Sequence, residues 1–179
     1  MTGGVPLLPR FFPTVMINMA ESVGLRVRTL LLGVGNPILS DDGAGIHVAR
    51  TLQKLEIAGV QVEELPASGL ELLDCIYGYD KVIIVDAIKT DRGRPGDLYE
   101  LTEADFEKTI HGSSPHGVNI PTALALGRSI VPDRMPKEIL FFAIEADDIV
   151  NVSEKLTPKV AEAIPGIVKK IEDVLRRSG

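Results

Sequence analysis

The stretch that decides the fold is TLLLGVGNPILSDDGAG, residues 29–45. Its first four residues are an apolar run with a β-branched start, which predicts a short buried strand. Glycine, asparagine, proline and serine punctuate residues 33–40 and predict a turn. From Gly45 onward the apolar residues recur at helical spacing, so the whole stretch predicts a strand, a loop and a helix. The loop carries two adjacent carboxylates, Asp41 and Asp42, near the end of the strand.

The rest of the chain continues this alternation of strands and helices. Residues 81–88 are the clearest strand, because their core is continuously β-branched, as in a strand covered on both faces. Residues 60–65 and 138–144 predict further strands, and residues 97–101 predict a weaker one. Helices are predicted over residues 43–57, 70–76, 120–130 and 158–177. We therefore expect an α/β fold, a three-layer sandwich whose mainly parallel, twisted sheet has about five strands and helices on both faces. Residues 97–101 are the candidate for one antiparallel edge strand.

The length and composition are those of one ordinary globular domain. The chain has 179 residues, of which 45% are hydrophobic and 25% charged, and we expect a single α/β domain over residues 28–179. Residues 1–27 contain three prolines and no positive segment ahead of an apolar run, so they do not predict a signal peptide. We expect a flexible N-terminal extension there, or residues upstream of a start at Met16 or Met19.

Charge, hydropathy and cysteine content argue against several classes of protein. A net charge of −6 argues against a general nucleic-acid binder. No apolar run approaches the ~20 residues that span a bilayer, so we expect no membrane insertion. Cys75 is the one cysteine, which excludes an intramolecular disulfide and a thiolate-rich metal cluster. Its apolar surroundings in sequence favour a buried small hydrophobe, and this cysteine usage fits a reducing, cytoplasmic setting.

The glycines of the first loop do not complete a dinucleotide-binding motif. That motif needs G-x-G-x-x-G, whereas the glycine after Gly33 and Gly35 is Gly43. Two acids at the start of the helix would also repel a pyrophosphate from its positive end. We therefore expect no organic cofactor.

Two carboxylates and one imidazole are predicted to meet at one edge of the sheet. Asp42 follows the first strand, Asp86 ends the third, and His116 lies in the loop before a later helix. Ligands bind beyond the carboxyl ends of the strands in such sheets, so these side chains form a candidate site for a divalent transition metal with open positions. Each also has a structural alternative: an N-cap at Asp41 or Asp42, a turn cap at Asp86, and a backbone contact at His116.

Other titratable residues are weaker candidates. His47 lies one turn inside the first helix, and His111 lies in a loop expected to be exposed. The acids that follow the fourth long strand either line the same edge or are simply solvated; they are Glu145, Asp147 and Asp148. The chain contains no H-E-x-x-H and no G-x-S-x-G, which argues against a standard zinc or serine protease.

Three segments resemble, in order and spacing, the motifs of one enzyme family. They are GVGNPILSDDGAG at residues 33–45, IVDA at 84–87 and SPH at 114–116, and ASGLELL at 67–73 and LTP at 156–158 fit as well. These segments resemble the [NiFe]-hydrogenase maturation endopeptidases, and the resemblance extends over roughly residues 29–177. No counterpart is identified for residues 1–27.

This resemblance implies an endopeptidase that removes the C-terminal extension of a [NiFe]-hydrogenase large-subunit precursor after nickel insertion. It implies that Asp42, Asp86 and His116 contact the metal, and that the nickel is supplied by the precursor. Cleavage would use a metal-activated water or a carboxylate as general base, as an aspartyl-type protease does.

Two other functions remain open at this point. The start GVGNP, residues 33–37, also resembles peptidyl-tRNA hydrolases, although the chain continues with Asp41 and Asp42 and its acidity suits tRNA poorly. A non-catalytic, nickel-sensing chaperone of the precursor is the other alternative.

Overall fold

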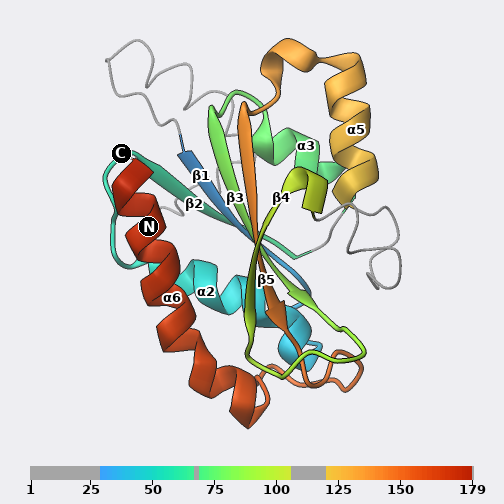
Figure 1. The fold of residues 1–179 in the computed structure, drawn as a ribbon, viewed down its shortest axis with the longest axis vertical. Helices are drawn as coiled ribbons and strands as arrows, with labels where there is room; N and C mark the ends of the chain where they lie inside the picture. Colours follow the sequence, from blue (N-terminus) through green and yellow to red (C-terminus); the bar gives the residue numbers. More distant parts are fainter. Residues whose placement is uncertain (1–28, 67–68, 106–119, 179) are drawn as a thin grey trace, which may run out of the picture.

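The structure is a computed structural model that describes residues 29–66, 69–105 and 120–178. These residues form one five-stranded sheet with the order β2-β1-β3-β5-β4 (Figure 1). β1, β2, β3 and β5 are parallel, and β4 pairs antiparallel to β5 at the edge. The strands are β1 (Thr29–Val34), β2 (Val60–Leu65), β3 (Lys81–Ile88), β4 (Leu98–Thr102) and β5 (Glu138–Glu145).

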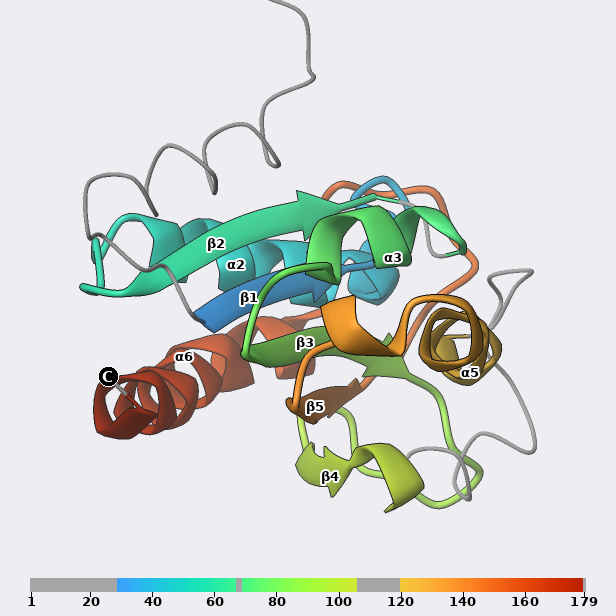
Figure 2. The same cartoon turned by 90° about the horizontal axis from the view of Figure 1, so that it is seen from above.

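Helices cover both faces of the sheet, as Figure 2 shows. Alternate residues of the central strands face opposite layers. Leu32 and Ile84 belong to the core formed with α3 (Glu71–Ile76) and α5 (Ile120–Ile130). Leu31 and Ile83 belong to the core formed with α2 (Ala44–Gln53) and α6 (Pro158–Ser178). The predicted three-layer α/β sandwich with one antiparallel edge strand is confirmed.

The ends of several elements differ from the predictions. β1 extends to Val34, beyond the predicted run 29–32, because Gly33 and Val34 still pair with β2. The first helix is preceded by a 3-10 turn, η1 (Ser40–Gly43), and α2 ends at Gln53 instead of residue 57. Glu56 has a φ of 46°, which a right-handed helix cannot contain, so the helix stops before it.

Two further expectations concern the termini and the membrane. The N-terminal extension over residues 1–27 lies outside the described residues. Among the helices of the described residues, none has the length and apolarity needed to cross a bilayer.

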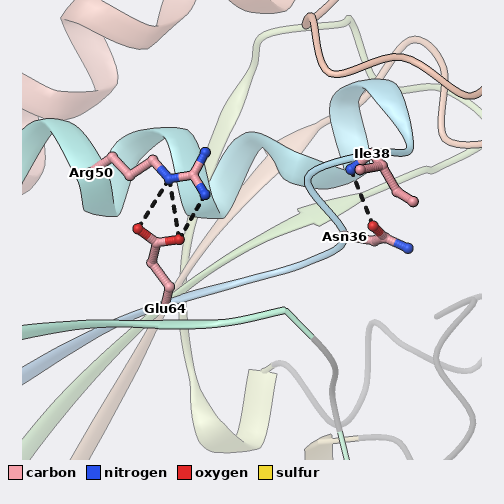
Figure 3. Close-up of polar contacts among 4 residues, drawn as sticks. All are labelled: Asn36, Ile38, Arg50 and Glu64. Carbon is pink, nitrogen blue, oxygen red and sulfur yellow. Dashed lines mark hydrogen bonds and ion pairs between the residues drawn. The ribbon is translucent and has the colours of Figure 1, made fainter. Parts of the chain in front are cut away.

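Close contact between α2 and the sheet depends on two glycines. A Cβ on Gly45 would lie 2.2 Å from the Val85 carbonyl oxygen and 2.4 Å from that of Val34. A Cβ on Gly33 would lie 2.4 Å from the Gly45 carbonyl oxygen. These distances are far below van der Waals contact, so only glycine fits. The contact holds the start of α2, and η1 with it, against the carboxyl ends of β1 and β3. On the exposed side, Arg50 of α2 donates to Glu64 of β2 (Figure 3).

Replacing Gly45 with alanine is expected to lower the free energy of unfolding by about 3 kcal/mol, because the added methyl group must push α2 off the sheet. Gly166→Ala is the matched control: nothing lies within 4 Å of its Cβ, and it lies inside α6. That change should instead raise stability by up to about 1 kcal/mol through helix propensity. Urea denaturation of the wild type and both variants measures the free energies of unfolding. Equal values for the two variants would show that Gly45 is not needed for close packing of α2 on the sheet.

Candidate active site

The candidate site lies where the strand order reverses. From β1 the chain crosses to β2 on one side, and β3 lies on the other side of β1. Parallel sheets bind ligands beyond the carboxyl ends of the strands at such a switch point. Asp42 follows β1 and Asp86 lies in the last part of β3, so the topology brings the two carboxylates to the same edge.

Asp42 is held by the loop that precedes it. Its side chain is buried, and its Oδ2 accepts a hydrogen bond from the backbone N–H of Asn36 at 2.8 Å. The Asn36 Oδ1 in turn accepts from the N–H of Ile38 at 3.1 Å (Figure 3). Gly35 has a φ of +130°, and a Cβ there would lie 1.9 Å from the Asp42 carbonyl oxygen. The glycine therefore allows the loop to fold back onto Asp42, as the turn residues predicted.

Asp86 lies on the face of the sheet that α3 and α5 cover. It alternates with Val85 and shares the face of Ile84, which belongs to the same core cluster as Ile120 at the start of α5. Its side chain is buried, and its Oδ1 accepts from the N–H of Ala87 at 2.8 Å. β3 ends at Ile88, as predicted, so Asp86 lies two residues before the end of the strand. It pairs with Ala143 of β5 inside the sheet.

His116, the third predicted site residue, lies outside the described residues, as does His111. Within the described residues, no group of three or more His, Cys, Asp or Glu side chains could hold a metal ion. Asp42 and Asp86 alone provide two oxygen-donor side chains, so an imidazole would be needed to give a set that suits a late transition metal.

Asp41 has a structural role, but it does not cap the adjacent helix as one alternative predicted. The N-caps of η1 and α2 are Leu39 and Gly43, and neither makes a side-chain capping bond. The fully buried Asp41 carboxylate instead accepts four hydrogen bonds from residues more than a hundred positions later in the chain. The donors are the N–H groups of Asp147, Asp148 and Thr157 and the hydroxyl of Thr157, at 2.7 to 3.0 Å. Asp41 thus ties the loop after β5 and the start of α6 to η1.

Glu145, the last residue of β5, and Asp148, in the loop after it, also have structural partners. Glu145 is fully buried and accepts from the N–H of Thr90 at 2.7 Å and from its hydroxyl at 3.0 Å. The Asp148 carboxylate accepts from the N–H groups of Val150 and Asn151, and these bonds lower the pKa of Asp148. Glu145 is therefore not a solvated acid, and its burial is a feature that its position in the sequence did not indicate.

Cys75 cannot act as a thiolate nucleophile at neutral pH. Burial, the largest cause, and the nearby carboxylates of Glu63, Asp74 and Glu71 together raise the pKa of its thiol to about 11. The thiolate is the reactive form, and its population at pH 7 is negligible at such a pKa. The prediction of a buried small hydrophobe holds only in part, because Cys75 of α3 packs against the core but is half-buried.

Comparison with known proteins gives a consistent result. The sequence model of the family described as "Hydrogenase maturation protease" matches residues 46–174. The hydrogenase 2 maturation protease of Escherichia coli is 28% identical over 156 residues, which cover 86% of this chain and 93% of that protein. The solved structure of the hydrogenase maturating endopeptidase HybD from E. coli has a TM-score of 0.73 at 27% identity, covering 85% of this chain and 94% of that chain.

A second solved structure agrees with the first. The [NiFe] hydrogenase maturation protease HybD from Thermococcus kodakarensis has a TM-score of 0.70 at 26% identity, covering 83% of this chain and 99% of that one. These matches favour a peptidase over the peptidyl-tRNA hydrolase and over the non-catalytic chaperone. The chain belongs to the hydrogenase maturation protease family and is a peptide-bond hydrolase.

Proposed function

We propose that this endopeptidase removes the C-terminal extension of a [NiFe]-hydrogenase large-subunit precursor after nickel has been inserted. The observation that supports this most directly is the placement of two buried carboxylates, Asp42 and Asp86, at the same edge of the sheet, beside its switch point, in a member of this family. Nickel is here part of the substrate, because the precursor carries it.

Recognition of the loaded precursor would depend on Asp42, Asp86 and His116. Carboxylate oxygens and an imidazole nitrogen are ligands that nickel accepts, and three such ligands leave positions for the precursor's own groups. A precursor without nickel would lose these contacts and bind more weakly. The binding step would thereby distinguish a loaded precursor from an empty one.

Cleavage requires a water molecule activated beside the scissile bond. Either Asp42 or Asp86 can accept a proton from that water as a general base, or the precursor's metal can lower the pKa of the water. Both routes place the scissile bond at the carboxyl ends of β1 and β3. Neither route uses Cys75, whose raised pKa keeps it protonated.

The test is incubation of the purified protein with nickel-loaded and nickel-free precursor, followed by mass spectrometry of the products. We expect the loaded precursor alone to become shorter by a single C-terminal peptide. Equal cleavage of both forms would contradict the role of nickel, and cleavage of neither would contradict the function itself.

A further inference from the structure

Three aliphatic side chains are exposed on the two loops that adjoin the site. Ile38 is 50% exposed, Val150 is 79% exposed and Val152 is 80% exposed. Ile38 lies in the loop after β1, and the valines lie in the loop after β5; the two loops run side by side in Figures 1 and 2. We call these residues the aliphatic patch. Exposed apolar side chains that gather beside a site, instead of lying singly, mark an interaction surface.

The two loops pair with each other like strands. Leu39 forms a parallel bridge with Ser153. The Ser153 N–H donates to the Ile38 carbonyl at 3.0 Å, and the Ser40 N–H donates to the Ser153 carbonyl at 2.7 Å. A parallel register continued by one residue from this bridge puts Ile38 opposite Val152, which directs both side chains to the same side of the paired loops.

The exposure of the patch does not result from a loose loop. The Asp41 N–H donates to the Asp148 carbonyl at 2.9 Å, and the Asp41 carboxylate accepts from the N–H groups of Asp147 and Asp148. The Asp148 carboxylate fixes the turn at Val150. Because the backbone is held on both sides, these side chains are presented to water in a fixed arrangement. Such preorganisation reduces the entropy lost when a partner binds.

One loop carries both Ile38 of the aliphatic patch and the Asn36 backbone that holds Asp42. The Ile38 N–H donates to the Asn36 side chain, and the Asn36 N–H donates to the Asp42 carboxylate. A polypeptide whose scissile bond lies beside Asp42 would then run along the loop that carries Ile38.

The charges around the patch argue against a second copy of this chain as its occupant. The carboxylates of Asp147, Asp148 and Glu154 flank the two valines, with Lys155 beside them. Two copies facing each other through this surface would bring like charges together, because a two-fold interface places each patch on itself. We propose that the aliphatic patch is the docking surface for an aliphatic segment of the precursor, which rests on the function proposed above.

The test compares two variants with the nickel-loaded precursor as the probe. Ile38→Ser/Val152→Ser removes this opposed pair, and Ile130→Ser is the matched control. Ile130 is 66% exposed at the end of α5. The chain continues from there through η2 (Pro132–Arg134) to the start of β5, so Ile130 lies at the edge of the sheet opposite to the site. We expect the double variant to raise KM at least about tenfold, with kcat changed less than about twofold, since the lost contact is made equally in the ground and transition states. Ile130→Ser should match the wild type.

Direct binding separates this inference from the proposed function. Fluorescence anisotropy of labelled, nickel-loaded precursor should show the same weakening in the double variant, whether or not the wild-type protein cuts. If the wild type binds without cutting and the double variant binds weakly, the proposed function fails and the docking surface stands. Unchanged binding by the double variant would overturn the docking surface, and so would an equal loss in Ile130→Ser. A wild-type dimer that the double substitution dissociates in sedimentation would also overturn it in favour of a self-interface.

Discussion

Asp42→Asn is expected to fold as the wild type does and to cleave the nickel-loaded precursor with kcat/KM reduced by about 10²- to 10⁴-fold, the contribution typical of a positioned acid or base. The amide keeps an oxygen that can accept from the Asn36 N–H, so the loop retains this hydrogen bond. It loses the negative charge that both proposed roles require, namely metal contact and proton acceptance. Mass spectrometry of the timed reaction measures the rate, and urea denaturation checks the fold.

The matched control for this variant is Asp133→Asn. It makes the same chemical change at an exposed residue of η2, on the edge of the sheet opposite to the site. We expect its rate to equal that of the wild type. If Asp42→Asn also retained the wild-type rate, Asp42 would have no part in metal contact or proton transfer.

Asp41→Ala is expected to lower the free energy of unfolding by about 3 kcal/mol, because four part-buried donors lose their acceptor at once. Three backbone N–H groups and the Thr157 hydroxyl all depend on this carboxylate. In a domain of this size the loss corresponds to a fall in Tm of about 6 to 12 °C. Urea unfolding curves with unchanged slope would give the difference directly.

Glu154→Ala is the control for Asp41→Ala. Glu154 belongs to the same loop, but it is exposed. Replacing it should change the stability by less than about 0.5 kcal/mol, as surface substitutions usually do. If the free energy of unfolding of Asp41→Ala fell by less than about 1 kcal/mol, water would have replaced the lost acceptor. The carboxylate would then not be needed to hold the loop after β5 against η1.

The fold could be predicted from the sequence because its signals are local. The β-branched run of β3 and the helical spacing after Gly45 each lie within one segment, and their alternation specifies a parallel sheet. The same reasoning identified Asp42 and Asp86 as acids at one edge, since parallel strands end together. The ends of the elements were predicted less accurately. For example, α2 was expected to reach residue 57, but it ends at Gln53, before the positive φ of Glu56.

The roles of Asp41 and Glu145 could not be predicted because their partners are distant in the chain. Asp41 binds residues 106 to 116 positions away, and Glu145 binds Thr90, 55 positions away. Acids in a loop have the same sequence signature whether they are solvated or buried, and only the assembled sheet distinguishes them. The aliphatic patch was missed for the same reason, because the pairing of Leu39 with Ser153 joins two loops that no local pattern connects.

The bonds between Asp41 and Thr157 have a consequence for the order in which the enzyme is made. A ribosome delivers the chain from its N-terminal end, so the segment bearing Asp42 is synthesised more than a hundred residues before the donors that secure its neighbour. A nascent chain can therefore pair β1, β2 and β3 before η1 has the hydrogen bonds that Asp41 accepts from Asp147, Asp148 and Thr157. The loop that presents Asp42 therefore reaches its final support only when the start of α6 has been synthesised.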